Sequence, residues 1–446
     1  MTREVGLLTS ETPWQPVRQS GPRVLVLGLN YAPEPTGIAP YTAGLCRGLV
    51  RRGFRVRGIV AVPHYPAWRV ADGYGRWAVD EVDAGVGLRR VRHYIPSSPK
   101  PLRRLLSEVT FGARLLSSRW RRFDVLVLVS PALFSSAIAM LRATLRRRPV
   151  VVWVQDFYSL GLAETGQGGS LVEKVVRRIE SWLLRRADRV VVIHERFRAQ
   201  AIESLGVEPE RAHVVRNWTH VPPANGDTRA STRRRFGWSD DEFVVVHAGN
   251  IGVKQALGNV VEAARLADAR EPRLRFVVLG DGSEAEAIKA QANGVGRIQF
   301  ISPLPTEEFG AVLRAADALL VNEKPGVREM AVPSKLTSYF STGVPVIAAT
   351  DSESITAFEI AASGAGIQVP AGDPASLIEG SRRLRDRPDL CAQLGKNGLA
   401  YQESVLTEST AIEGFASLIE RLADPDGPGR PKRSQETHHA MTRGEF

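Results

Sequence analysis

Short runs of apolar residues recur along the whole chain, and segments with helical spacing of apolar residues separate them. In the first half these runs are Val24–Leu29, Val56–Val62, Val125–Ser130, Val150–Asp156 and Arg189–Glu195. In the second half they are Phe243–Gly249, Arg275–Gly282, Arg297–Ser302, Ala318–Glu323 and Val344–Thr350. Runs without polar alternation are typical of parallel strands that are covered by helices on both faces.

The pattern predicts an α/β protein with two doubly wound parallel sheets. A polar, proline-containing stretch near residue 220 separates the two series of strands, and a length of 446 residues is ample for two domains. An apolar stripe, which includes Ile412 and Phe415, predicts a helix that packs on one of the domains. The predicted organisation is a loose tail (1–21), a first domain (22–220), a second domain (221–405), the packing helix (406–423) and a disordered tail (424–446).

The net charge of +11 favours an anionic partner, such as a nucleotide, a membrane surface or nucleic acid. Two cysteines, Cys46 and Cys391, give neither a disulfide framework nor a zinc-binding spacing, which fits a reducing compartment. The first 21 residues lack the apolar core of a signal peptide, and the apolar run from Pro131 is too short to cross a bilayer. These features predict a cytoplasmic protein.

Two glycine-rich turns follow the first strand of each half. The first reads GLNYAPEPTG and ends at Gly37; the second reads GNIGVKQALG and contains Asn250 and Lys254. In parallel sheets such turns lie at the carboxyl edge, where free N–H groups of helix ends attract anions. Lys254 is therefore a candidate phosphate ligand, although a solvated loop lysine is the alternative. Neither turn has the dinucleotide fingerprint or the Walker A sequence.

A third segment, VPSKLTSYFSTGVPVI, begins at Val332 and has the form of a turn, a short helix and a strand. Ser334 has the position of an N-cap, and Lys335 follows it. The free N–H groups of this helix end, together with Lys335, would form a second anion-binding site at the same edge.

Taken in order, the segments NYAPEPTGIAPYT, PHYPAW, VQDFY, GNIGVKQAL, GDGSE, FISPLP and VPSKLTSYFSTGVPVI resemble the retaining GT-B glycosyltransferases of family 4. The subgroup that builds bacterial exopolysaccharide of the colanic acid type is the most similar. The resemblance covers residues 22–423, and the combination of segments is far more specific than any one of them.

The resemblance implies a GT-B fold in which the second domain holds a nucleotide-sugar, with UDP as the favoured nucleotide, and the first domain holds the acceptor. It implies that Lys254 and Gly37 contact the donor diphosphate, that Asn250 of the same turn as Lys254 also binds the donor, and that no separate cofactor is needed. Three further positions, Gly280, Asp281 and Pro303, would border the base.

The sequence departs from the family at one place. Many members carry two glutamates where this chain has Met330 and Ser338, and neither of these residues can act as a carboxylate. By the resemblance, the ribose and sugar contacts then fall to a neighbouring group of residues: Glu329, Ser334, Lys335 and Leu336.

Glycosyl transfer releases an anionic diphosphate, so the protein chiefly has to stabilise that leaving group. We find no closely spaced aspartates at a strand end that would hold a divalent ion, and we expect a metal-independent reaction. Asp156 is the first-domain candidate for a carboxylate nucleophile. Its alternatives are to cap the following segment or to position the acceptor hydroxyl. The resemblance favours attack on the same face of the sugar, with the leaving phosphate taking the acceptor proton.

Acceptor-side candidates are His64, Tyr65 and Tyr41, and a loop packed by Trp68 is the alternative for the first two. For His194, at a predicted strand end, we expect a structural role.

The segment from Lys100 to Phe123 combines six arginines and a lysine with interspersed leucines and Trp120. This composition is typical of a helix that lies on an anionic membrane surface. The alternative is a core helix with a solvated basic face. A lipid-linked glycan as the acceptor would favour the first, and would place the protein at the inner face of the cell membrane.

Three functions are consistent with the sequence. The first is sugar transfer to a lipid-linked acceptor. The second is a different GT-B activity, either transfer to a soluble acceptor or epimerisation of a nucleotide-sugar. The third is nucleic-acid binding, which the charge alone suggests; no aromatic-rich basic motif supports it, and we expect no nucleic-acid partner.

Overall fold

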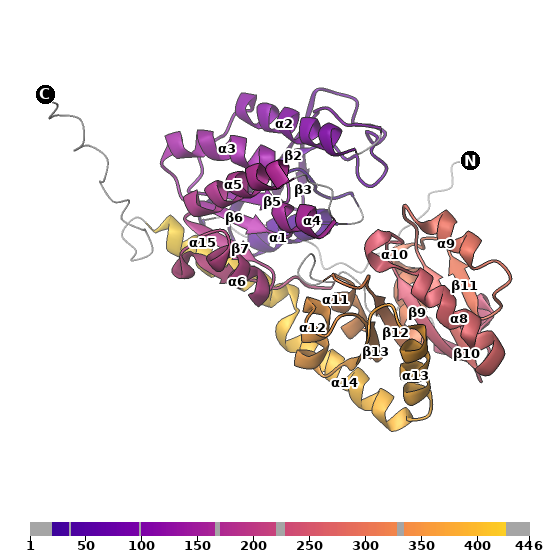
Figure 1. Ribbon diagram of the computed structural model, residues 1–446. Coiled ribbons are helices and arrows are strands. Elements are labelled where there is room, and N and C mark those ends of the chain that lie inside the picture. Colours follow the sequence, from indigo (N-terminus) through magenta and orange to yellow (C-terminus); the bar gives the residue numbers. More distant parts are fainter. Residues whose placement is uncertain are drawn as a thin grey trace, which may run out of the picture.

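The computed structural model describes residues 20–34, 37–97, 100–165, 170–219, 228–327 and 334–424. These residues form two α/β lobes, each built around one sheet (Figure 1). The strand order is β3-β4-β2-β1-β5-β6-β7-β8 in the first lobe and β11-β10-β9-β12-β13-β14 in the second. The predicted α/β class with two doubly wound halves is confirmed.

The strands and helices alternate along each lobe. The first lobe contains β1 (Arg23–Gly28), α1 (Ala39–Arg51), β2 (Arg55–Ala61), β3 (Ala78–Asp83), β4 (Val86–Val91), α2 (Pro101–Ser117), β5 (Val125–Ser130), α3 (Leu133–Arg146), β6 (Val150–Val154), α4 (Tyr158–Thr165), α5 (Ser170–Arg186), β7 (Arg189–Val192), α6 (Glu195–Glu203), the 3-10 helix η1 (Pro209–Arg211) and β8 (Ala212–Val214).

The second lobe contains α7 (Arg229–Phe236), β9 (Phe243–Ala248), the 3-10 helix η2 (Val253–Gln255), α8 (Gly258–Arg270), β10 (Leu274–Leu279), α9 (Ala285–Gln291), β11 (Ile298–Ile301), α10 (Thr306–Ala315), β12 (Ala318–Asn322), α11 (Ser334–Phe340), β13 (Val346–Ala349), α12 (Ile355–Ser363), β14 (Gly366–Val369), α13 (Pro374–Arg385) and α14 (Pro388–Val405). The last helix is α15 (Glu408–Ala423).

Every strand pair is parallel except β3 and β4, which form an antiparallel hairpin at the edge of the first sheet. The sequence did not lead us to these two strands. Their segments, AVDEVD and VGLRRV, mix charged residues with apolar ones, and charged residues are typical of a half-exposed strand at the edge of a sheet. These two strands were not predicted because neither contains an uninterrupted apolar run.

Helices cover both faces of the first sheet. The core on one face includes residues of α2, α3, α5 and α6, and the core on the other includes residues of α1 and α15. No helix in the described ranges is both long and apolar enough to cross a membrane.

The last two helices connect the lobes. α14 packs against α11 and α13 in the second lobe, whereas α15 returns to the first lobe and packs against α1 and β5 (Figure 1). Phe415 of α15 is fully buried, and its ring lies 5.0 Å from that of Trp153 on β6, measured between centroids. The buried side chains of α15 thus belong to the hydrophobic core of the first lobe.

A buried ionic cluster joins the lobes at a second place. Glu359 of α12 accepts hydrogen bonds from His194 Nε2 at 2.9 Å and from Arg216 at 2.5 Å. Burial alone would raise the pKa of Glu359, but the bonds and charges of His194 and Arg216 hold it below its ordinary value. The other ring nitrogen of His194 accepts the N–H of Arg196 as the N-cap of α6. The structural role expected for His194 is confirmed.

Replacing Phe415 by alanine should lower the free energy of unfolding of the first lobe by about 3–5 kcal/mol, because a fully buried aromatic ring would leave a cavity. Urea unfolding followed by tryptophan fluorescence measures the loss. Leu145→Ala on the exposed face of α3 is the control, with an expected change within about 0.5 kcal/mol. A loss for Phe415→Ala as small as that of the control would contradict the packing of α15 on this lobe.

Candidate active site between the two lobes

The predicted residues of both lobes lie after strands, at the carboxyl edge of each sheet. In the first lobe, Gly37 follows β1, His64 and Tyr65 follow β2, and Asp156 follows β6. In the second lobe, the residues after β9, β10 and β11 are Asn250, Lys254, Gly280, Asp281 and Pro303. Because adjacent strands of each sheet are parallel here, these turns share one edge.

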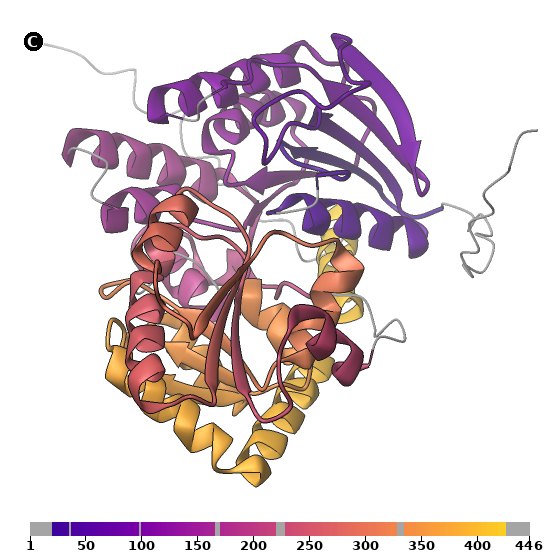
Figure 2. The same ribbon diagram turned by 90° about the vertical axis from the view of Figure 1, so that its right-hand side faces the viewer.

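A contact between α1 and α11 brings the two edges together. Tyr41, in the first turn of α1, shares a side-chain hydrogen bond with Thr337 of α11. Burial raises the pKa of the Tyr41 hydroxyl to about 12, and the bond with Thr337 opposes that shift. Figure 2 shows α1, in indigo, at the junction of the lobes. The Gly37 turn therefore lies close to the start of α11.

This contact corrects one expectation. Tyr41 was predicted to line the acceptor side, but its side chain is buried against Thr337 and against the edge of the Trp218 ring. It joins the lobes and has no exposed surface to offer an acceptor.

Residues at and just after the end of β12 donate hydrogen bonds to backbone carbonyls of the turn that carries Lys254. The Asn322 side chain donates to the carbonyls of Gln255 at 2.8 Å and Ala256 at 3.2 Å, and the N–H of Lys324 donates to the carbonyl of Lys254 at 2.8 Å. Lys254 itself is partly exposed, and no carboxylate in the described ranges forms an ion pair with it. Its backbone is fixed and its ammonium is available.

Lys335 comes from α11 to the carboxyl end of β9. Its Nζ lies 2.9 Å from Nε2 of the buried His247. Burial lowers the pKa of Lys335 to about 7, and the negative charge of Glu323 opposes that shift. The second predicted cation therefore lies beside the Gly249 turn and not only at the helix end, where we expected it.

Close backbone approach explains the glycine of GDG. A Cβ on Gly280 would lie 1.9 Å from the carbonyl oxygen of Gly249, and the φ of Gly280 is +146°. Only glycine lets the turns after β9 and β10 come this close. Asp281 is exposed, and its carboxylate accepts the N–H of Gly282 at 2.8 Å.

The two acceptor-side candidates after β2 have different environments. His64 is buried, with Nδ1 2.9 Å from the Val62 carbonyl oxygen. The carboxylate of Glu34 accepts the N–H groups of both His64 and Tyr65 at 2.8 Å. His64 thus serves the loop structure, which corrects the acceptor-side expectation for it. Tyr65 is 38% exposed, and its ring lies beside Gly37.

The remaining predicted residues differ in how the structure describes them. Leu336 has its side chain in the core of the second lobe, so only its backbone could face a ligand. Ser334 is the first residue within α11, not the residue before it, and only its backbone is described. Glu329 and Met330 lie outside the described residues. Asp156 is half-buried at the end of β6.

The sequence alone did not identify Glu34, His247, Asn322 and Glu323. Their side chains hydrogen-bond to residues or turns of the candidate site or, for Glu323, act on Lys335 through charge. Glu323 follows β12 and accepts hydrogen bonds from Thr350 and Thr356. A signal existed for His247, which is the one polar residue inside the apolar run FVVVHA. A polar residue in a buried strand requires a partner, and the sequence could not say which one.

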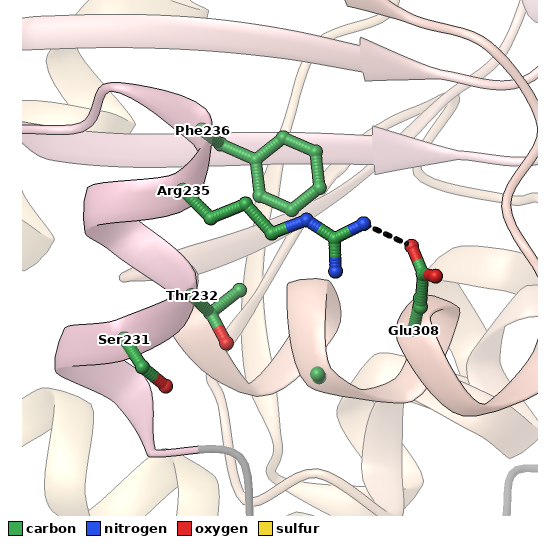
Figure 3. Close-up of a pocket in the computed structure, with 6 residues that line it drawn as sticks. Ser231, Thr232, Arg235, Phe236 and Glu308 are labelled. Atoms are coloured by element: carbon green, nitrogen blue, oxygen red, sulfur yellow. Dashed lines mark hydrogen bonds and ion pairs between the residues drawn. The ribbon is translucent and has the colours of Figure 1, made fainter.

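Two cavities lie in the second lobe. A polar one of about 500 Å³ lies after β13 and β14 and is lined by Thr350, Asp351, Ser352, Glu353, Gln368, Pro370 and Ala371. A smaller one of about 110 Å³ lies between α7 and α10, where Arg235 reaches across to Glu308 (Figure 3). Neither is lined by a predicted site residue.

Among the described residues, no group of three histidine, cysteine or acidic side chains is arranged to hold a metal ion.

Comparisons with known proteins give one matching family model for each lobe. The family model of the glycosyl transferase 4-like domain matches residues 36–218, and that of glycosyl transferases group 1 matches residues 228–400. WcaI of Escherichia coli (strain K12), a glycosyl transferase assigned to colanic acid biosynthesis, is 33% identical over 339 residues, which cover 72% of this chain and 81% of WcaI.

Solved structures show the same fold. Sucrose-phosphate synthase from Thermosynechococcus elongatus superposes with a TM-score of 0.69 at 16% identity, over 90% of this chain and 99% of that one. HepE of Anabaena, in complex with UDP-glucose, superposes with a TM-score of 0.65 at 15% identity, over 89% and 99%. The expected GT-B fold is confirmed.

Gly280→Ala should destabilise the second lobe by at least about 2 kcal/mol, because the added Cβ meets the Gly249 carbonyl and the positive φ is strained for alanine. Thermal unfolding measures the effect. Gly87→Ala in β4 is the control, since a Cβ there meets nothing within 4 Å. Equal melting temperatures for the two variants would mean that the turns after β9 and β10 do not approach in this way.

Proposed function

Since the chain belongs to the glycosyltransferases that combine a glycosyl transferase 4-like domain with a group 1 domain, we propose a specific reaction for it. It transfers a sugar from a nucleotide-sugar, with UDP as the favoured nucleotide, to a lipid-linked glycan. The product belongs to exopolysaccharide or another cell-surface polysaccharide. The anomeric configuration is retained and no metal ion takes part.

The contact of Tyr41 with Thr337 is the observation that carries this proposal. It brings the Gly37 turn of the first lobe to α11 of the second, and Lys335 of α11 in turn reaches the Gly249 turn that leads to Lys254. In the proposed site, two lysines of the second lobe and one glycine turn from each lobe would surround one ligand. A diphosphate bound there would meet cations and backbone N–H groups from more than one side.

This arrangement suits the departure of a diphosphate. The leaving group gains negative charge in the transition state, and fixed cations placed in advance stabilise that charge without reorganisation. Lys254 would act on the phosphate as a point charge from a rigid turn, since Asn322 and Lys324 hold its backbone. The solved complex of HepE with UDP-glucose supports UDP as the nucleotide.

Asp156 would orient the acceptor hydroxyl from the first-lobe edge. A role as nucleophile would require its carboxylate within about 3 Å of the anomeric carbon. In the proposed reaction the acceptor attacks on the face that the diphosphate leaves, and the leaving phosphate takes the acceptor proton.

The outer surface of the first lobe fits a lipid-linked acceptor. α2 packs beside α3, and α3 beside α5 (Figure 1). Leu102 is 80% exposed and Leu145 is 84% exposed. We call this surface the apolar-basic face; its other exposed apolar side chains are Leu106, Val109, Leu116, Leu141, Leu171, Val172 and Val175, and exposed arginines accompany them at 103, 104, 146, 147, 177 and 178.

This composition suits the interface of an anionic membrane, where leucines enter the lipid and arginines meet headgroups. α2 has a separate buried side, with Phe111 and Leu115 in the core, so its exposed leucines are not needed for folding. Trp120 is also in the core, although the sequence grouped it with the membrane-facing residues. We propose that the protein lies on the inner face of the cell membrane through this face.

Lys254→Ala should lower the transfer rate by about 10²- to 10³-fold and leave the fold intact, as removal of a fixed anion-stabilising donor does in other enzymes. The assay uses UDP-sugars and a lipid-linked acceptor fraction and contains EDTA throughout. Lys396→Ala, at an exposed position of α14, is the matched control. Full activity of Lys254→Ala would remove this lysine from the site, and loss of wild-type activity in EDTA would contradict the metal-independent reaction.

Replacing Leu102, Leu106 and Leu116 together by serine should release the protein from vesicles that contain anionic lipid, because these exposed side chains provide apolar area for the bilayer interface. Co-sedimentation with vesicles of phosphatidylcholine and phosphatidylglycerol measures binding. Leu399→Ser, in the second lobe, should bind as the wild type does. Equal binding of the triple variant would place membrane contact elsewhere on the protein.

A further inference from the structure

His247 is a fully buried polar residue within an apolar strand. It occupies β9, and every residue of that strand is buried. A buried imidazole is costly without a hydrogen-bond partner, and its partner here is the ammonium of Lys335 at 2.9 Å. Because an ammonium can only donate, Nε2 of His247 must be the acceptor, and the imidazole must be neutral.

The environment keeps this imidazole neutral. Burial lowers the pKa of His247 well below its ordinary value, and the charge of Lys335 lowers it further. His247 is therefore neutral and can accept the hydrogen bond of Lys335 whenever the lysine carries its proton.

Gly249 makes room for the lysine. A Cβ on Gly249 would lie 2.9 Å from Cε of Lys335, so any larger residue would displace the side chain. The φ of Gly249 is +125°, which other residues rarely adopt. The side chain of Lys335 thus passes beside the turn that leads to Asn250 and Lys254, and His247 fixes the end of it.

A purely structural lysine would be a poor choice at this position. A half-buried ammonium loses part of its hydration, and methionine or leucine would fill the same space without that loss. The ammonium instead lies at the sheet edge that presents Lys254 and the glycine turns.

We propose that His247 is a positioning residue for phosphate binding: it holds the Lys335 ammonium at the Gly249 turn, where that ammonium binds the diphosphate of the nucleotide. This inference rests on the proposed function, since the phosphate is that of the sugar donor. His247 itself touches no substrate and acts through Lys335.

The ionisable groups around Lys335 allow the direction of the pH dependence to be worked out. His247 faces it from β9 and Glu323 from the end of β12, and Asp351 acts on Glu323 in turn. His247 stays neutral, and burial raises the pKa of Glu323, which loses its negative charge when it is protonated as the pH falls. The affinity for UDP should therefore decrease as the pH rises through about 7, because the Lys335 ammonium then loses its proton.

The test compares UDP with uridine, which lacks the phosphates, by calorimetry between pH 6 and pH 9. His247→Leu should weaken UDP binding by about tenfold, as expected for one displaced charge-assisted contact, and leave uridine binding unchanged. It should also move the midpoint of the pH dependence to lower pH, because the ammonium loses its acceptor. His247→Gln should restore both properties, since its amide oxygen can take the place of Nε2.

Several outcomes would overturn the inference. One is a folded His247→Leu variant with the wild-type ratio of UDP to uridine affinity and the wild-type midpoint. If that variant does not fold, Lys335→Met serves instead: it should abolish the decrease above pH 7, and persistence of the decrease would overturn the inference. Loss of UDP binding in Lys254→Ala but not in the His247 or Lys335 variants would uphold the proposed function and reject the role of His247.

Discussion

The buried carboxylate of Glu359 fixes how the two lobes meet, and the composition of the candidate site depends on that arrangement. Glu359 belongs to the second lobe, and the groups that satisfy it, His194 and Arg216, belong to the first. A carboxylate in such a place is stable only while both partners remain. Separation of the lobes at this point would leave a charge without its counterpart, so the cluster favours the observed arrangement.

The C-terminal helix adds an apolar contribution to the same constraint. α14 ends in the second lobe, and α15 completes the core of the first through Phe415 and its neighbours. The chain therefore crosses between the lobes twice. The second crossing, between α14 and α15, joins the lobes through apolar packing, in addition to the ionic cluster of Glu359.

The two lysines of the site differ in their physical character. Lys254 is carried by a rigid turn and is partly exposed, so its ammonium keeps much of its hydration. Lys335 is half-buried, and burial lowers its pKa to about 7. An anion that reaches both would find one hydrated ammonium on a rigid turn and one ammonium whose charge depends strongly on its surroundings. Such a pair would suit a substrate whose negative charge increases during the reaction.

The sequence by itself determined the two-lobed α/β fold and the edge on which the chemistry lies. Uninterrupted apolar runs predict parallel strands, and parallel strands bring the turns that follow them to one edge of the sheet. The sequence alone therefore assigned Gly37, Lys254 and Gly280 to the carboxyl edges. The β3–β4 hairpin was missed because charged residues interrupt its apolar positions, unlike the apolar runs of the central strands.

Only the tertiary structure decided which side chains meet. Tyr41 and Thr337 lie in different lobes, and His247 and Lys335 lie far apart in the sequence. His194 and Glu359, which are hydrogen-bonded to each other, also lie in different lobes. Burial and partner choice are properties of packed elements, whereas sequence periodicity reports only which face of one element is apolar. For this reason Tyr41, His64 and Leu336 could be assigned to the correct edge and still prove to be buried.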